Sequence, residues 1–271
     1  MNELTKLGRY EVLTKLATGG MAELYLAYFS GPGGFRKFVA LKRILPAYRS
    51  EDEFVAMFLD EARVSAALSH ANIAQVFELG ESGQDFFIAM EFIEGQDLAR
   101  INRAARKAGG VLPVGFAAGV MRDVCGALHY AHGFTSPGGR PLPVVHRDLS
   151  LRNVMLTYAG HTKVIDFGIA KAKGSLASTQ GGQVKGSAGY MSPEQIRGEA
   201  LDGSSDLFAA GAVLYELLTG RRVFTGQDPT ATMYKVLNET PPPPHALNPE
   251  VPQPLSEVTM RALEKQKDRR F

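Results

Sequence analysis

The sequence has almost no cysteine and no long apolar run, and both absences exclude classes of protein. Cys125 is the single cysteine among 271 residues, so no intrachain disulfide can form. Its neighbours Met121, Val124 and Leu128 predict a buried helical position and not a reactive thiol. Residues 1–10 lack the apolar core of a signal peptide, and no uncharged apolar run is as long as a membrane span. We therefore expect a cytoplasmic chain, which leaves open a membrane span outside this stretch.

A strong excess of one charge is also missing. The chain has 30 lysines and arginines against 28 aspartates and glutamates, which gives a formal net charge of +2. A dedicated nucleic-acid binder normally carries a concentrated basic footprint, so nucleic acid is not an expected partner. Hydrophobic residues make up 45% of the chain and charged residues 21%, as in ordinary globular proteins. The length is enough for one large domain or two modest ones.

The order of local patterns predicts an α+β fold with two lobes. The first ninety residues alternate strand-like runs with one strong helix, and the remainder is mostly helical. We place the boundary near residues 91–96, where Gly95 interrupts an apolar strand. The strong helix is expected to begin at Ser50, because Ser50 and Glu53 have the spacing of a capping box.

The apolar face of this helix contains an acidic residue. The residues at helical spacing on that face are Phe54, Phe58, Glu61, Ser65 and Leu68. A buried carboxylate is costly unless it is paired, so Glu61 needs a cation from another element. Lys42 is the candidate, because residues 38–42 read as a strand that ends in this ammonium. The alternative is that Glu61 lies at the edge of the stripe and is solvated.

The second half contains a helix that is apolar on all sides and a proline-rich segment. The helix is expected over residues 206–219, capped by Ser204 or Ser205 and terminated by Gly220. Such a helix is buried and should form the axis of the second lobe. The proline-rich residues 240–254 predict a rigid loop between helices, with a polyproline ligand as the alternative.

Two short motifs indicate the chemistry. The first is Val-His-Arg-Asp-Leu-Ser-Leu-Arg-Asn at residues 145–153, and the second is Asp-Phe-Gly at residues 166–168. The first motif places Asp148 five residues before Asn153 on one loop. A second carboxylate, that of Asp166, follows after a short hairpin.

That hairpin should bring two oxygen ligands together. Residues 154–156 and 163–165 read as short strands, with residues 158–161 as the turn between them. Their ends would place Asn153 and Asp166 at the same mouth, where two hard oxygen ligands can hold a hydrated magnesium ion. Asp148 would lie beside that ion and orient a hydroxyl group.

These motifs resemble the catalytic loop and the Asp-Phe-Gly element of protein kinases. The resemblance covers residues 10–271 and is strongest to bacterial members of the eukaryotic-type (Hanks-type) serine/threonine kinases. It implies a protein-kinase fold, with a small N-lobe to about residue 91, a hinge at about 91–96 and a C-lobe that lacks its last helix. It further implies ATP with Mg²⁺, or Mn²⁺ as the alternative, protein substrates with serine or threonine acceptors, and self-association for autophosphorylation in trans.

The resemblance also implies a set of catalytic residues. Asp148 matches the base that accepts the proton of the substrate hydroxyl. Asn153 and Asp166 match the magnesium ligands. Lys42 matches the residue that holds the α- and β-phosphates while it is paired with Glu61.

Nucleotide contacts are implied at positions spread over both lobes. They are Leu16, Ala17, Thr18, Gly19, Gly20, Met21, Ala22, Glu23, Leu24, Ala40, Lys42, Met90, Glu91, Ile93, Asp97 and Met155. Met90 would be the gatekeeper, and the backbone of Glu91 and Ile93 would meet adenine. Asp97 matches the position that contacts ribose, and Met155 the floor of the adenine pocket.

The glycine-containing turn departs from the family pattern. Only Gly19 is retained of three glycines, since Ala17 and Ala22 occupy the places of the first and third. Leu24 and Ala40 would form the roof over adenine. By itself this turn is a weak motif, and its position before Lys42 gives it meaning.

The catalytic loop departs from the family pattern as well. Ser150 stands where serine/threonine kinases usually carry a lysine, and Leu151 replaces the proline that follows. Loss of a cation there could cost on the order of 10²–10³ in rate. Arg152 matches the place where tyrosine kinases often have a compensating arginine. His146 is expected to pack beneath Phe167 as a structural imidazole.

The segment from Asp166 to Glu194 corresponds to an activation segment. Arg147 could capture a phosphate on this segment, with an unmodified flexible loop as the alternative. The candidate phosphosites are Ser175, Ser178 and Thr179. Near its end, residues 186–190 resemble a serine/threonine-type substrate platform. Arg270 matches the arginine that pairs with Glu194.

Three functions follow as hypotheses. The first is an active serine/threonine protein kinase in bacterial signalling, because its key residues are all present. The second is a nucleotide-binding pseudokinase or weakly active scaffold, because Ser150, Ala17 and Ala22 depart from the pattern. The third is a small-molecule kinase, against which the substrate platform argues.

Overall fold

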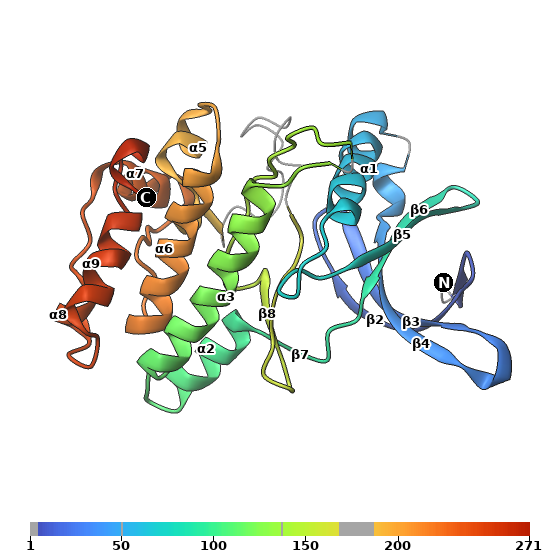
Figure 1. Cartoon of the computed structure of the whole chain (residues 1–271), viewed down its shortest axis with the longest axis horizontal. Helices are drawn as coiled ribbons and strands as arrows, with labels where there is room; N and C mark the ends of the chain where they lie inside the picture. The colour runs from blue at the N-terminus through green and yellow to red at the C-terminus, as the bar shows by residue number, and fades with distance from the viewer. Residues whose placement is uncertain (1–4, 50, 137, 168–186) are drawn as a thin grey trace. The chain divides into compact units, whose positions relative to one another are not determined.

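The computed structural model describes residues 5–49, 51–136, 138–167 and 187–271. The chain divides into two compact units, Met1–Glu94 and Gly95–Phe271. The first unit is a sheet with one long helix, and the second is mainly helical (Figure 1). This is the α+β composition that the sequence predicts.

The first unit is built on a six-stranded sheet in the order β1-β2-β3-β4-β6-β5, in which all neighbours are antiparallel. Its strands are β1 Lys6–Leu7, β2 Tyr10–Thr18, β3 Ala22–Ser30, β4 Arg36–Ile44, β5 Val76–Ser82 and β6 Asp85–Glu91. The short 3₁₀ turns are η1 Pro32–Gly34 and η2 Pro46–Tyr48. Gly33 and Gly34 both have positive φ in the connection from β3 to β4, a conformation that glycine adopts without strain.

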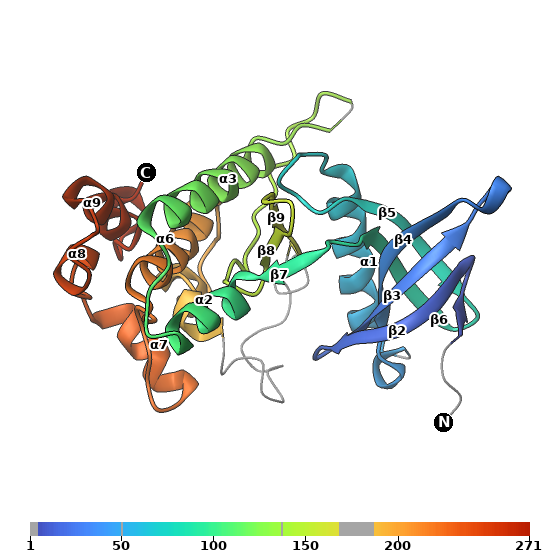
Figure 2. The same cartoon turned by 90° about the horizontal axis from the view of Figure 1, so that it is seen from below.

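The two faces of this sheet bury different clusters. Tyr25, Val39 and Leu41 belong to the cluster on one face. On the other face, Ile44 and Ile88 pack with residues of the helix α1 Asp52–Ala67. Alternate residues of a strand point to opposite faces, so neighbouring sequence positions contribute to different clusters. Figure 2 shows α1 alongside the sheet.

Helix α1 begins later than the sequence predicts. Its N-cap is Glu51, which makes no side-chain capping bond, and Ser50 lies outside the described residues. The backbone of Glu51 still belongs to the preceding turn, because its N–H donates to the carbonyl of Tyr48 at 3.3 Å. The observed N-cap thus lies one residue after the predicted one, and the expected capping box falls on a residue outside the described part of the chain. Asp52 and Glu53 occupy the first turn, where negative charge favours the helix dipole.

The second unit combines a small sheet with several helices. The sheet has the order β7-β8-β9, with β7 Gly95–Asp97, β8 Val154–Thr157 and β9 Thr162–Val164. The helices and 3₁₀ turns are α2 Leu98–Lys107, α3 Val114–His132, η5 Ala188–Tyr190, α5 Pro193–Arg197, α6 Gly203–Thr219, α7 Pro229–Asn238, α8 Pro244–Leu247, α9 Gln253–Ala262 and η6 Lys267–Arg269. None of the helices in the described part of the chain is both long and apolar enough to cross a membrane.

Helix α6 is the buried centre of the second unit, as its composition predicts. Nearly all of its residues from Ser205 to Thr219 are buried, and it contacts α3, α8 and α9. A Cβ at Gly211 would lie 2.8 Å from the Cβ of Ala262, so this glycine permits close approach of α9. The helix ends at Gly220 in the left-handed conformation, as expected.

The start of α6 was predicted two to three residues late. Asp202 is the N-cap, and its carboxylate accepts the N–H of Ser204 at 2.9 Å. Ser204 and Ser205 lie in the first turn instead of capping it. The prediction was wrong because several adjacent residues can cap a helix, and local sequence does not decide among them.

Two further predictions concern the surface. Cys125 is exposed on α3, so the prediction of a buried thiol is wrong. The buried positions of α3 include Val124 and Leu128, and Cys125 falls beside that stripe. The proline-rich residues 240–254 cover most of the connection from α7 to α9, where a loop was predicted, but they also contain the short helix α8 and the first two residues of α9.

Candidate active site

The ion pair between Lys42 and Glu61 is present in the first unit. The Nζ atom of Lys42, in β4, donates to Oε1 of Glu61, in α1, over 2.5 Å. The Lys42 side chain is 20% exposed and that of Glu61 11%. Glu61 is therefore paired and largely buried, and the solvated alternative is excluded.

This pair yields a stability prediction. Replacing Lys42 by methionine leaves the Glu61 carboxylate largely buried without its cation, and we expect a loss of about 1–3 kcal/mol of unfolding free energy. Urea unfolding followed by circular dichroism measures it. Lys42→Met with Glu61→Leu should recover most of the loss, because no buried charge remains. A double variant as unstable as the single one would contradict this account.

Four residues expected to contact a nucleotide share one face of the first sheet. Leu24 lies directly opposite Lys42, and Ala40 directly opposite Met90. Opposed residues of antiparallel strands point to the same side, and so do residues two apart on one strand. The same face carries Ile44 and α1. The sheet register thus gathers positions that are up to 66 residues apart in sequence.

The glycine-containing turn joins β2 to β3. Strand β2 ends with Leu16, Ala17 and Thr18. The connection consists of Gly19, Gly20 and Met21, and β3 begins with Ala22, Glu23 and Leu24. The N–H of Gly19 donates to the carbonyl of Ala22 at 2.8 Å. Burial raises the pKa of Glu23, but hydrogen bonds from Lys15 and Tyr25 outweigh it, and the pKa lies below its usual value. The base of the turn is thus held by a charged contact.

At the other end of this face, β6 leads into the boundary between the units. Its last residue, Glu91, donates its N–H to the carbonyl of Gln75 at 2.8 Å, and its side chain accepts the N–H of Gln75 at 3.1 Å. The N–H of Glu91 is thus already used. A contact between the Glu91 backbone and adenine would therefore use the carbonyl group. Ile93 follows the strand in a short segment without regular secondary structure.

In the second unit, the catalytic loop is closed by Asn153. Its Nδ2 atom donates to the carbonyl of Asp148 at 2.8 Å and lies 3.3 Å from Oδ2 of Asp148. The N–H of Asn153 donates to the carbonyl of Ser150 at 3.0 Å, and its own carbonyl accepts the N–H of Ile165 at 3.0 Å. The last bond brings Asn153 beside the residue that precedes Asp166, as the predicted hairpin requires.

This geometry fits a magnesium ion that is held by few protein atoms. The Nδ2 atom of Asn153 faces Asp148, and this fixes the orientation of the Asn153 amide. The amide oxygen of Asn153 and the carboxylate of Asp166 are hard oxygen donors, and they lie near the ends of the paired strands β8 and β9. Asp166 has a φ of +53°, an uncommon conformation for a residue other than glycine. Within the described ranges, no group of three or more His, Cys, Asp or Glu could hold a metal. Mg²⁺ commonly binds one or two carboxylates and completes its shell with phosphates and water.

His146 packs against Phe167 as a structural imidazole, as predicted. It is fully buried, and its ring lies 4.7 Å, between centroids, from that of Phe167. Nδ1 accepts the N–H of Asp148 at 3.3 Å, which leaves Nε2 to donate to the carbonyl of Ile165 at 3.1 Å. Both nitrogens are thus used to hold backbone, as a structural imidazole would be.

Asp206 is a site residue that the sequence analysis missed. Its carboxylate is 1% exposed and accepts the N–H groups of His146 at 2.7 Å and Arg147 at 2.9 Å. It also lies 2.7 Å from Nε2 of His132. Arg147 has a φ of +66°, so Asp206 holds the loop in an unfavourable conformation. An acidic residue in a mainly apolar helix was the available signal, although Glu216 gives the same signal on that helix.

Asp97 and Met155 face each other in the pairing of β7 with β8. Asp97 is also the N-cap of α2, because its carboxylate accepts the N–H of Arg100 at 2.8 Å. A guanidinium nitrogen of Arg100 lies 3.3 Å from the same carboxylate. A ribose contact by Asp97 would have to share this capping bond, which the sequence analysis did not anticipate.

The expected activation segment is described only at its ends. Gly168, Ser175, Ser178 and Thr179 lie outside the described residues. Nε of Arg147 is buried and has no hydrogen-bond partner among the described residues. The carbonyl of Arg147 accepts a hydrogen bond from Gln195 at 2.6 Å. The described end continues through Ser187 into η5, and the hydroxyl of Tyr190 donates to Glu216 at 2.6 Å.

The expected pair of Glu194 and Arg270 is confirmed. Two guanidinium nitrogens of Arg270 lie 2.7 and 2.9 Å from the two carboxylate oxygens of Glu194. Both residues are buried, at 2% and 3% exposure. Burial raises the pKa of Glu194, but the bonds from Arg270 and Ser205 outweigh it, so the pKa lies below its ordinary value. This fixes the end of the segment to the chain's last residues.

Comparison with known proteins gives a consistent result. A family model described as the protein kinase domain matches residues 10–271. Tyrosine-protein kinase MasK of Myxococcus xanthus is 43% identical over 96% of this chain and 40% of its own length. Serine/threonine-protein kinase PrkC of Bacillus subtilis is 35% identical over 97% of this chain and 38% of its own length. This chain thus spans about two fifths of the curated relatives it matches.

Solved structures show the same likeness. The crystal structure of the Mycobacterium tuberculosis PknI kinase domain superimposes with a TM-score of 0.72 at 30% sequence identity. The match covers 98% of this chain and 92% of that domain.

Proposed function

The chain belongs to the protein kinase domain family, and on this basis we propose that it transfers the γ-phosphoryl group of ATP to serine and threonine hydroxyls of proteins. The observation that carries the proposal is the catalytic loop, in which Asn153 binds Asp148 and the hairpin bonds Asn153 to the residue before Asp166. Phosphoryl transfer needs positioning and charge neutralisation more than covalent chemistry, and these groups supply both.

Each residue has a role in the proposal. Asp148 orients the acceptor hydroxyl and accepts its proton. The oxygens of Asn153 and Asp166 would hold Mg²⁺, or Mn²⁺ as the alternative, which neutralises phosphate charge when bound. Lys42 holds the α- and β-phosphates, and Glu61 fixes its ammonium through the observed ion pair.

Adenine recognition is proposed for the first unit. Leu24, Ala40 and Met90 give their face of the sheet an apolar patch next to Lys42. Apolar walls with a few backbone groups suit an adenine ring. The carbonyl of Glu91 and the backbone of Ile93 would supply the polar contacts.

The acceptor residue is open to a second candidate. The relative with 43% identity is named a tyrosine-protein kinase, and Arg152 matches a position at which tyrosine kinases carry arginine. Residues 186–190 favour serine or threonine, as does the naming of PrkC. Three peptides with the same flanks and a Ser, Thr or Tyr acceptor separate the two. Labelling of the tyrosine peptide alone would overturn the proposed acceptor.

Arg152 is proposed to supply the cation that Ser150 lacks. Replacing Arg152 by alanine should lower kcat by about 10²–10³, because one donor to developing phosphoryl charge is lost. Arg152→Lys retains the charge and should keep most of the rate. Initial rates at saturating ATP measure both. Wild-type kcat in Arg152→Ala would show that Arg152 does not compensate.

The scaffold alternative makes a distinct prediction. A pseudokinase would be thermally stabilised by ATP and would label no protein. Transfer of label to a generic protein substrate excludes it, and transfer to small molecules of a cell extract alone would favour a small-molecule kinase.

We also propose autophosphorylation between copies, for which the initial rate should rise with the square of protein concentration.

A further inference from the structure

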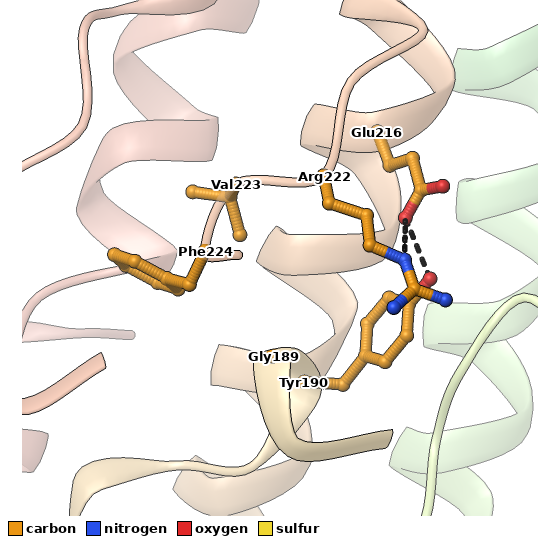
Figure 3. A pocket seen from close by; sticks show the side chains of 6 residues that line it. All are labelled: Gly189, Tyr190, Glu216, Arg222, Val223 and Phe224. Atoms are coloured by element: carbon orange, nitrogen blue, oxygen red, sulfur yellow. Dashed lines mark hydrogen bonds and ion pairs between the residues drawn. The ribbon is translucent and has the colours of Figure 1, made fainter. Parts of the chain in front are cut away.

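A hollow in the second unit lies beside the end of the expected substrate platform. It is lined by Gly189, Tyr190, Glu216, Arg222, Val223 and Phe224 (Figure 3). Tyr190 comes from η5, Glu216 from α6, and Arg222 from the segment that follows α6. Because η5 ends the platform-like residues 186–190, an acceptor peptide bound there would run past these side chains.

The carboxylate in this hollow is already engaged. Glu216 is 5% exposed. Its Oε2 accepts the hydroxyl of Tyr190 at 2.6 Å, and its Oε1 accepts the amide of Asn102 at 3.4 Å. Both oxygens are thus used within the unit, so Glu216 is poorly placed to receive a cationic side chain from a substrate.

Arg222 is placed differently. Its Nε lies 4.0 Å from Oε2 of Glu216, and its side chain is 40% exposed. The guanidinium lies 5.8 Å from the centroid of the Tyr190 ring. Figure 3 shows its terminal nitrogens on the side away from Glu216. A planar fork of N–H donors held in this way suits a carboxylate, which it can bind through two hydrogen bonds.

The exposed charged side chains around the hollow are positive, like Arg222. Burial and the Glu216 carboxylate raise the pKa of Tyr190, and the positive charges of Arg222 and Arg152 act in the opposite direction. Both arginines are exposed, whereas the one acidic group of the hollow is buried. A peptide that runs along η5 therefore meets a local excess of positive charge.

We propose that Arg222 is a specificity-determining residue that binds an aspartate or glutamate side chain near the acceptor residue of a protein substrate. The proposal rests on the proposed kinase function and adds a substrate class to it: acceptor segments that carry a carboxylate.

The test compares kcat/KM for matched serine peptides. One series carries glutamate at successive positions around the acceptor, and the other carries glutamine there. The wild-type chain should favour one glutamate peptide by about tenfold over its glutamine partner, as expected for a charge-assisted contact at a partly exposed site. Arg222→Gln should abolish this ratio, and Arg222→Glu should favour the corresponding lysine peptide. Arg221→Gln, an exposed neighbour outside the hollow, should keep the wild-type ratio.

The outcomes separate this inference from the function on which it rests. A purely structural role of Arg222 would lower kcat/KM for both peptides equally and leave the ratio intact, which would overturn the inference. Equal use of all peptides by the wild-type chain would also overturn it, while transfer itself would uphold the kinase proposal. If the wild-type chain labels no peptide or protein, the proposed function fails and the inference fails with it.

Discussion

Replacing Asp148 by asparagine should lower kcat by about 10²–10⁴, the range expected when a positioned general base is lost. The amide cannot take the proton of the acceptor hydroxyl, but it has nearly the same size as the carboxylate. The amide of Asn153 donates to the backbone carbonyl of Asp148, which the substitution leaves in place. We therefore expect the loop to keep its shape and the chain to bind nucleotide as before.

The experiment measures kcat for a protein substrate and the thermal shift on addition of ATP. A large loss of kcat with an unchanged shift supports the role of Asp148 as the base. Asp123→Asn is the matched control, because Asp123, on α3, accepts a hydrogen bond from the hydroxyl of Thr162, on β9, and has no proposed catalytic role. Equal kcat in wild type and Asp148→Asn would contradict the assignment.

Replacing Arg270 by alanine should destabilise the chain by about 3–5 kcal/mol, because it leaves the carboxylate of Glu194 buried without its partner. Arg270 is also bonded to the carbonyls of Glu264 and Ser204, and it lies over the Phe208 ring at 5.0 Å. The loss should appear as a lower urea midpoint. Arg269→Ala is the control, since Arg269 is exposed and its loss should change stability by less than about 0.5 kcal/mol.

The same pair predicts how this loss depends on pH. Glu194 has a lowered pKa in the folded chain against an ordinary value of 4.5. Its contribution to stability is therefore fully present above that value and is lost as pH falls below it. In Arg270→Ala the buried carboxylate can be relieved by protonation. The difference in unfolding free energy between the two proteins should shrink below about pH 4.5, and a difference that stays constant down to pH 3 would contradict this.

Local pattern was enough to predict several strands, among them parts of β4, β8 and β9, and the Lys42–Glu61 pair. Strands alternate with a period of two and the helix with a period of 3.6, so the sequence shows which side chains face inward. The buried carboxylate of Glu61 then requires a cationic side chain, and few lysines or arginines in the first unit stand at an inward-facing position of a strand. The pair of Glu194 and Arg270 was predicted only from the resemblance to a family, because nothing local connects residues 76 positions apart.

Other features depend on contacts that no local pattern encodes. Asp206 binds the catalytic loop from a helix sixty residues later, and its role appears only when the two elements meet. The hollow around Arg222 is likewise assembled from η5, α6 and the segment after it. Helix starts were wrong at Ser204 because a neighbouring aspartate capped the helix instead. Cys125 was misplaced because one residue along a helix rotates a side chain by about 100°.

The central claim is that this chain moves a phosphoryl group from ATP to protein hydroxyls by means of Asp148, Asn153 and Asp166. The most direct test supplies ATP labelled in its γ-phosphoryl group, with Mg²⁺ or Mn²⁺, to the wild-type chain and to Asp166→Asn, and identifies the labelled amino acids. The account predicts labelled serine and threonine with the wild type, and a loss of transfer in the variant that extra divalent ion partly restores. No label from the wild type with either ion, or equal label from both proteins, would contradict it.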